Sequence, residues 1–188
     1  MPRMLKIILS WALICGLILG LTACTAAQPS EKGAAEKMTA EKLSDLILTF
    51  DKEAKVNENN VQFMLSERAV FLVFDEKADR MRIMSPIAPA GLANEEILTR
   101  MLQANHDAVL DARYSLANDV VWSVFIHPMG SLTQDDFLSG VAQTVTAAKT
   151  FGSSYTSGAI VFGGGDSNTI HKDLLKELED AAQSRTKI

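Results

Sequence analysis

The spacing of hydrophobic residues changes several times along the chain, and each spacing predicts one type of element. Apolar residues at i, i+3, i+4 and i+7 are typical of an amphipathic helix, and short apolar runs between turn residues are typical of strands. Helices are expected to begin after the capping residues Thr39, Asn94 and Thr133, and a loosely attached last helix is expected over roughly residues 169–183. Strands are expected at residues 61–65, 69–74, 81–85, 110–116 and 120–126.

Individual residues set the limits of these elements. The first helix is expected to end near Lys55, and Pro86 and Pro89 are expected to end the third strand. A polar turn at residues 117–119 predicts a hairpin between the last two strands. The core-facing residues of three helices are expected to be Leu43, Leu46, Ile47 and Phe50, then Ile97, Leu98, Met101 and Leu102, then Phe137, Leu138, Val141, Val145 and Ala148.

The order of the expected elements is helix, three strands, helix, two strands, helix, with one further helix at the C-terminal end. Runs of antiparallel strands between helices predict an α+β fold, in which a five-stranded antiparallel sheet is covered by helices mainly on one face. We expect this domain at residues 39–151. Residues 152–188 add a segment rich in Gly and Ser and the last amphipathic helix.

Two of the expected strands, residues 69–74 and 120–126, are apolar on both faces. A strand with one face in water should instead alternate apolar and polar residues. We therefore expect a dimer mate or a bound peptide to cover the second face, and the alternative is that the C-terminal helix or the N-terminal tether folds over it. The residues assigned to this binding or dimer surface are Val70, Leu72, Phe74, Val120, Trp122, Val124 and Ile126.

Residues 1–23 account for much of the slightly positive mean hydropathy of +0.09. Arg3 and Lys6 accompany an apolar stretch, residues 7–21, of the length that a secretory signal uses, and it is shorter than a transmembrane helix needs. The tetrapeptide that ends at Cys24 resembles a bacterial lipobox. This resemblance implies cleavage before Cys24 and a covalent diacylglycerol and N-acyl lipid on that residue. An uncleaved anchor or an ordinary signal peptide is the alternative.

Lipidation at Cys24 makes a bilayer the first expected partner. Residues 24–38 are small and polar and predict a flexible tether to the membrane. Thr25 follows Cys24 where inner-membrane lipoproteins of enteric type carry aspartate, which favours the periplasmic side of the outer membrane in a host with two membranes. Cys15 leaves with the signal peptide, so no disulfide is expected in the folded domain.

Charge and residue spacing argue against several functions. The chain has 23 acidic and 18 basic residues and a net charge of -5, which disfavours nucleic acid as a partner. The acidic pairs Glu95–Glu96 and Asp135–Asp136 lie in first helical turns, where the helix dipole explains them. We expect no catalytic residue, no metal site and no cofactor beyond the lipid. The candidates set aside include His106, His127 and His171, which lack metal-binding spacing, and the glycines at 163–165, which lack the rest of a P-loop.

Two short motifs carry a resemblance to a known family. The middle helix ends in Met101–Leu102–Gln103–Ala104–Asn105, close to an L-L-x-x-N pattern, and Leu132 to Phe137 match L-x-x-x-x-F. With the order of elements, they resemble type III secretion chaperones of the Tir-chaperone type and the related YbjN-like proteins. The resemblance implies a dimerising α+β module that binds extended segments of other proteins without catalysis. Those chaperones are cytosolic, whereas Cys24 predicts a location in the envelope.

The expected function is therefore that of a membrane-anchored lipoprotein with a non-catalytic, chaperone-like module that binds an extended peptide or an envelope protein and forms a homodimer. The first alternative is a sensory or regulatory envelope lipoprotein that binds a small ligand. The second is an envelope hydrolase. An enclosed cavity between sheet and helices would favour a small ligand, and an open apolar groove would favour a peptide.

Overall fold

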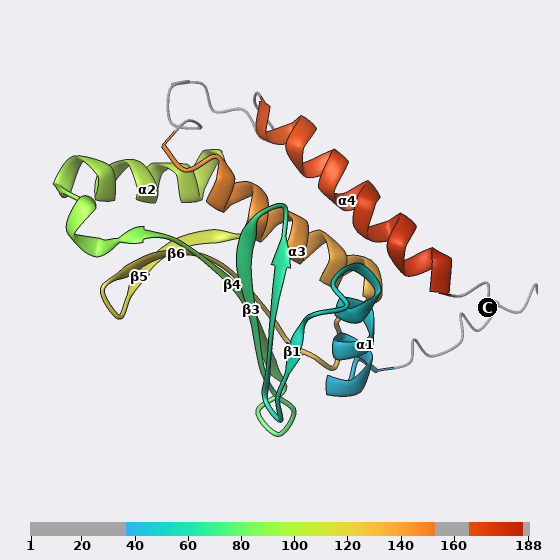
Figure 1. The fold of residues 1–188 in the computed structure, drawn as a ribbon. Coiled ribbons are helices and arrows are strands. Elements are labelled where there is room, and N and C mark those ends of the chain that lie inside the picture. Colours follow the sequence, from blue (N-terminus) through green and yellow to red (C-terminus); the bar gives the residue numbers. More distant parts are fainter. Residues whose placement is uncertain (1–36, 153–165, 186–188) are drawn as a thin grey trace, which may run out of the picture. The chain divides into compact units, whose positions relative to one another are not determined.

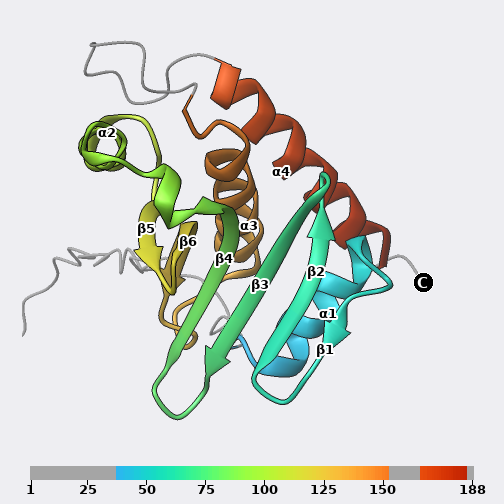
Figure 2. The same ribbon diagram turned by 60° about the vertical axis from the view of Figure 1, so that its left-hand side comes forward.

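The computed structural model describes residues 37–152 and 166–185, in which four α-helices and six strands form an α+β fold (Figure 1). The strands make one antiparallel sheet in the order β1-β2-β3-β4-β6-β5, as Figure 2 shows. The elements are α1 (Ala40–Phe50), β1 (Lys55–Val56), β2 (Asn60–Leu65), β3 (Arg68–Asp75), β4 (Arg80–Pro89), a 3-10 turn (Ala90–Leu92), α2 (Glu95–Asp107), β5 (Arg113–Ala117), β6 (Val120–His127), α3 (Gln134–Lys149) and α4 (Asp166–Arg185).

The first three helices begin where their capping residues predict. The side chains of Thr39, Asn94 and Thr133 each accept a hydrogen bond from a backbone N–H in the first turn of the helix that follows. These bonds satisfy donors that a helix N-terminus leaves without partners.

The predicted five-strand count is wrong, because residues expected at the end of the first helix form a sixth strand. Helix α1 ends at Phe50, and the carboxylate of Asp51 accepts hydrogen bonds from the backbone N–H of Glu53 at 2.9 Å and of Met64 at 2.8 Å. These bonds offer the backbone an alternative to another helical turn. The chain therefore turns after Asp51 and adds β1 to the edge of β2.

Helix α3 lies at the centre of the helical layer, so that nearly its whole surface is covered. Every residue from Gly140 to Ala148 is buried. The helix approaches the sheet closely at Gly140, where an added Cβ would lie 2.7 Å from two ring carbons of Phe125 on β6. Glycine is therefore required at this position by the packing distance and not by the backbone conformation.

Helix α4 runs along α3 on the side away from the sheet (Figures 1 and 2). Its residues Leu174, Leu178 and Ala182 belong to the same buried cluster as α1, α3 and strands β2 to β4. The expectation of a loosely attached last helix is wrong. The side of α3 that faces away from the sheet is also apolar, and α4 packs against it.

Helix α2 packs with β5 in a second, smaller cluster. Met101 and Ala104 are buried in this cluster, but Leu102, which was expected in the core, is 72% exposed. Strand β5 begins at Arg113, later than predicted, because the side chain of Gln143 on α3 accepts hydrogen bonds from the backbone N–H of Asp111 and Ala112. These residues are thereby tied to a helix instead of a neighbouring strand.

Strand β4 continues through Pro86 to Pro89, beyond the predicted end at residue 85. The pairing with β3 stops at Phe71–Met84, after which β4 pairs only with β6. Extending that register places Ala69 opposite Pro86, which has no N–H to donate. The hydroxyl of Ser85 donates to the Ala69 carbonyl at 2.9 Å instead. A proline is tolerated there because one side of β4 has become an edge.

The predicted hairpin between the last two strands is confirmed. Asn118 and Asp119 have φ of 50° and 59°, which is the backbone of a two-residue type I′ turn. A second turn with positive φ at both central residues, Ser66 and Glu67, joins β2 to β3. There Lys149 at the end of α3 donates a hydrogen bond to the Ser66 hydroxyl at 2.6 Å.

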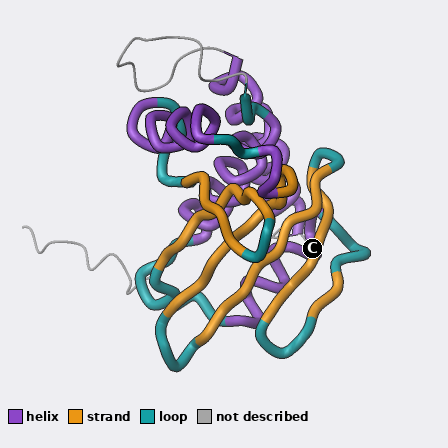
Figure 3. The backbone as a smooth tube through the Cα atoms, turned by 90° about the vertical axis from the view of Figure 1, so that its left-hand side faces the viewer, coloured by secondary structure: helices purple, strands orange, loops and turns teal. Residues whose placement is uncertain are grey.

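The helices cover one face of the sheet, and Figure 3 looks onto the strands with most of the helical segments behind them. The buried residues of β2, β3, β4 and β6 that face the helices alternate with residues on the other face. Among the described residues, none of the helices is both long enough and apolar enough to cross a membrane.

Candidate functional site

Strands β3 and β6, which are apolar on both faces, each place one set of residues in the core and the other set on the uncovered side of the sheet. On β3, Val70, Leu72 and Phe74 lie beneath the helices, with exposures of 0%, 0% and 6%. They are core residues and not part of an accessible surface, which corrects their assignment from sequence. On β6, by contrast, Val120, Trp122, Val124 and Ile126 alternate with the buried Val121, Ser123 and Phe125.

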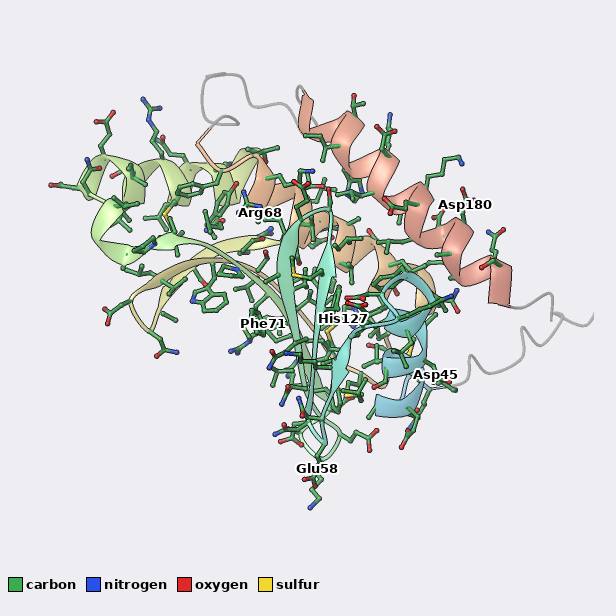
Figure 4. The ribbon with its side chains drawn as sticks, in the orientation of Figure 1. Asp45, Glu58, Arg68, Phe71, His127 and Asp180 are labelled. Atoms are coloured by element: carbon green, nitrogen blue, oxygen red, sulfur yellow. The ribbon has the colours of Figure 1, made fainter. Side chains whose placement is uncertain are left out.

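Phe71 and Val73 are the residues of β3 that share a face with Trp122 and Val124. In Figure 4, Phe71 lies on the opposite side of the strands from α1. We call the uncovered side the open face, and it consists of Gln62, Met64, Phe71, Val73, Arg82, Met84, Arg113, Ser115, Val120, Trp122, Val124 and Ile126.

The strand register arranges the open face in rows that run across the sheet. One row contains Val73, Arg82 and Ile126. The next contains Phe71, Met84 and Val124, with Gln62 and Arg113 at its two ends. An apolar centre with polar ends is the usual anatomy of a protein–protein interface.

The open face is hollowed into a groove of about 860 Å³ that runs from β2 to β5. Residues of the strands, of the turns between them and of the segment before β5 line this groove, and no helix contributes to its lining. A second hollow, at the β3–β4 turn, shares Val73, Arg82, Met84 and Ile126 with it. The two hollows therefore form one continuous open surface.

An aromatic pair is fixed across the middle of the groove. The rings of Phe71 on β3 and Trp122 on β6 meet edge to face, with their centroids 6.2 Å apart, although β4 lies between their strands. The indole N–H of Trp122 donates to the Ala117 carbonyl at 3.0 Å. The position of the indole is thus set before any partner binds, and aromatic side chains of this kind often anchor interfaces.

The groove is less acidic than the protein as a whole. Its charged lining residues are Arg82, Arg113 and Asp111, whereas the chain carries a net charge of -5. The adjoining hollow at the β3–β4 turn is more acidic, because its lining includes Glu41, Glu58, Asp75 and Glu76 beside Lys77, Arg80 and Arg82. The Arg113 guanidinium donates to the carbonyls of Leu110 and Ala112, so it is engaged with the backbone before β5. Arg82 stands among apolar neighbours at the centre of the sheet.

The edge of the sheet beside the groove is protected. Asn105 on α2 accepts a hydrogen bond from Tyr114 N–H and donates one to the Tyr114 carbonyl, which occupies the outer backbone groups of β5 at that residue. Natural sheets use such devices to prevent another strand from pairing with an edge. The accessible feature is therefore the face of the sheet and not this part of its edge.

The carboxylate pairs found in the sequence stabilise helix ends. The Asp136 carboxylate accepts from the Thr133 backbone N–H at 3.3 Å, and the Asp136 N–H donates to the Thr133 hydroxyl at 3.1 Å, which completes a capping box. The same carboxylate also accepts from the Thr133 hydroxyl at 2.6 Å. The bond from Thr133 lowers the pKa of Asp136 below its usual value. Glu95 and Glu96 lie in the first turn of α2, directly after the capping residue Asn94.

The histidines are placed apart from one another. His127 contacts the Pro128 carbonyl through Nδ1 at 2.7 Å and stacks on Phe125, and partial burial lowers the pKa of His171 on α4. His106 lies in the last turn of α2. In the part of the chain that the structure describes, no three His, Cys, Asp or Glu side chains gather as a metal site would require. Cys24, the tether up to residue 36 and the glycines at 163–165 lie outside the described residues.

Comparisons with known proteins identify a shared fold. No family model matches the chain, and no curated protein matches it. A chain of the ExsC–ExsE complex superposes with a TM-score of 0.50 at 14% identity, over 65% of this chain and 99% of that one. The Yersinia pestis type III secretion chaperone SycH, solved with a fragment of YscM2, gives 0.46 at 17% identity, over 60% and 99%.

A chain of the HopA1–SchA chaperone–effector complex gives a TM-score of 0.45 at 11% identity, over 58% of this chain and 92% of that one. At these identities the similarity concerns the fold alone. The resemblance to secretion chaperones seen in the sequence is thus confirmed for the α+β fold.

Proposed function

We propose that this protein is a membrane-anchored lipoprotein whose folded domain binds a segment of another protein on the open face, without catalysis. The anchor is the lipid on Cys24, and the domain faces away from the cytoplasm, on the periplasmic side of the outer membrane where the host has two membranes. The lipobox and the polar tether that follows it support the anchor. The fold shared with chains of chaperone complexes is compatible with protein binding.

The observation that carries the proposal is the large apolar content of a face that nothing in the described residues covers. Met64 and Ile126 are each 53% exposed and Val73 is 39% exposed. Helix α4, which was one candidate to cover this face, packs on α3 and α1 on the other side of the sheet. Burial of a large apolar side chain contributes roughly 1.5–3 kcal/mol, so a partner on these residues would gain substantial free energy.

The shape of the groove favours a protein segment over a small ligand. A small molecule is usually bound in a concave site that buries most of its surface. The groove on the open face instead crosses the sheet from β2 to β5 and is continuous with the hollow at the β3–β4 turn. The hydrolase alternative has no support from the acidic pairs, because Asp136 is engaged in its capping box and Glu95 and Glu96 lie beside the cap of α2.

Site-specific crosslinking in intact cells tests the proposal. A photoreactive amino acid in place of Val124 on the open face should give a discrete adduct with another protein, and the same group in place of the exposed Gln103 on α2 should not. Ile126→Asp in the same chain should reduce the adduct while lowering the free energy of unfolding by no more than about 1 kcal/mol, because the side chain is half exposed and strand propensities span about that much. Equal adducts from positions 124 and 103, or adducts only with a second copy, would contradict binding of a different protein on this face.

A further inference from the structure

We infer that the segment bound on the open face presents a carboxylate to Arg82, with apolar side chains on the neighbouring positions. This inference rests on the proposed function and adds the chemistry of the partner. It follows from the placement of one cation within an otherwise apolar part of the sheet.

Arg82 lies on β4, which has strands on both sides at this point. In the register, its neighbours across the sheet are Val73 on β3 and Ile126 on β6, and the next residue on the same face of β4 is Met84. Residues two apart on a strand are separated by about 7 Å. Towards the middle of the sheet the guanidinium therefore has aliphatic neighbours on the open face, at distances that a single bound segment would span, whereas towards the β3–β4 turn the same face continues with Arg80 and Asp75.

The guanidinium of Arg82 has no hydrogen-bond or ion-pair partner among residues 37–152 and 166–185. The other two charged residues that line the groove differ from Arg82, because one is already hydrogen-bonded and the other is acidic. Arg113 is engaged by the carbonyls of Leu110 and Ala112, and Asp111 is an acid near the β5 end of the groove. Arg80 precedes Arg82 on the same face but lies opposite Asp75, at the end of the strand. Arg82 is the cation at the centre of the groove.

A bound apolar segment would exclude water from Arg82. An arginine that loses water without gaining an acceptor is costly, whereas a carboxylate can accept two parallel hydrogen bonds from it. The same exclusion of water strengthens that ion pair. A partner with a carboxylate at this point is therefore favoured over one that is entirely apolar, and a partner with a cation there is rejected.

The same residue disfavours a second copy of the chain as the occupant. In a two-fold dimer whose axis passes beside Arg82, at the centre of this face, each Arg82 would approach its own symmetry mate. Like charges without an intervening acid would repel each other within the apolar surface. We therefore assign the open face to a different protein.

The test uses Trp122 as a reporter. The chain has two tryptophans, and Trp11→Phe leaves Trp122 as the only one whether or not residues 1–23 are removed. The full chain with this substitution, in detergent, is used to select from a displayed random dodecapeptide library. The inference expects selected peptides that carry Asp or Glu flanked by apolar residues and that change the emission of Trp122 on titration.

The contribution of Arg82 is measured with synthetic peptides from that selection, each made with its acid and with the matching amide, Glu→Gln or Asp→Asn. The amide should raise the Kd about tenfold or more on the wild-type sequence, and Arg82→Gln should remove the difference between the two peptides. Arg100→Gln on α2 makes the same change of charge on an exposed helix and should leave both affinities unchanged. Selection on Arg82→Glu should favour Lys or Arg peptides.

The outcomes separate this inference from the proposed function. Apolar peptides without acids that still change the Trp122 emission would overturn the role of Arg82 and leave the binding face in place. Some selected peptides could bind equally well to Ile126→Asp and leave the Trp122 emission unchanged. Such peptides would overturn both the role of Arg82 and the binding face. An absence of any selected peptide would also overturn both, and so would a dimer in sedimentation experiments that Ile126→Asp dissociates.

Discussion

The side-chain amide of Asn105 forms both outer backbone hydrogen bonds of Tyr114, in the way that a neighbouring strand would. Its Oδ1 accepts from Tyr114 N–H at 2.7 Å, and its Nδ2 donates to the Tyr114 carbonyl at 3.1 Å. Asn105 is the last residue of the L-L-x-x-N pattern that underlies the resemblance to secretion chaperones. In this chain the motif asparagine therefore has a structural role, which is to fasten α2 to β5 and protect the sheet edge.

Asn105→Ala should lower the free energy of unfolding by about 2 kcal/mol, because it leaves two partly buried backbone groups without partners. Urea denaturation measures this change. Gln103→Ala, on the exposed side of the same helix, is the control and should have little effect. A loss for Asn105→Ala no larger than for Gln103→Ala would show that the amide does not stabilise β5.

Gly140→Ala should destabilise the domain by about 1–3 kcal/mol, because the new methyl group overlaps the ring of Phe125. Alanine is the better helix former by about 1 kcal/mol, so helix propensity alone predicts the opposite sign. Gly91→Ala, where no atom lies within 4 Å of the added Cβ, is the control. In the Gly140→Ala background, Phe125→Leu should restore part of the loss. Thermal unfolding of the wild type, the two single glycine variants and the double variant shows whether steric overlap or helix propensity dominates at Gly140.

The contribution of the Thr133–Asp136 capping box should depend on pH. The Thr133 hydroxyl lowers the pKa of the Asp136 carboxyl in the folded state, so the stabilisation is present above the unfolded-state pKa and is lost as the pH falls through the folded value. Asp136→Asn should therefore cost up to about 1 kcal/mol at pH 7, and this cost should fall towards zero in acid as the carboxyl becomes protonated in the folded state. Asp135→Asn, in the same turn but outside the box, is the control. A cost for Asp136→Asn that is independent of pH would show that its ionised form is not what stabilises α3.

Leu178→Ala should cost about 2–5 kcal/mol, because Leu178 is fully buried between α4 and the rest of the core. Lys176→Ala removes only an exposed ion pair with Asp180 and should cost about 0.5 kcal/mol or less. Chemical denaturation followed by circular dichroism compares the two. Similar small effects would mean that α4 is a peripheral element after all.

Cys24→Ser should abolish incorporation of labelled palmitate, since the proposed anchor requires the Cys24 thiol as the acceptor of the diacylglyceryl group. Cys15→Ser, the other cysteine of the chain, should keep the label. The measurement is metabolic labelling followed by capture of the protein. Label that persists in Cys24→Ser would refute the lipobox.

Local chemistry made the helix starts and the hairpin predictable. Thr39, Asn94 and Thr133 cap helices because their side chains bond to the first turn, and Asn118–Asp119 form a turn because both residues accept positive φ. The errors arose where a distant partner decides the conformation. Asp51 ends α1 by binding Met64, thirteen residues further on, and Ser85 lets β4 pass through Pro86 by binding Ala69.

The candidate site was predictable in kind but only partly in its residues. The lack of apolar–polar alternation indicated that β3 and β6 are apolar on both faces, and Trp122, Val124 and Ile126 do lie on the open face. Which half of β3 faces outward depends on the register with β4 and on the position of α3, so Phe71 and Val73 could replace Val70 and Leu72 only after the fold was known. Arg82 was missed because a single arginine between Met81 and Ile83 looks like ordinary strand alternation.

The short pairing between β3 and β4 has a mechanical consequence for the sheet. Only five residue pairs, Phe71–Asp75 with Arg80–Met84, join β1, β2 and β3 to β4, β6 and β5. The sheet is thus two three-stranded wings with one short common junction, and the groove lies across it. We expect a small change in twist at this junction to alter the curvature of the groove while the pairing inside each wing is kept.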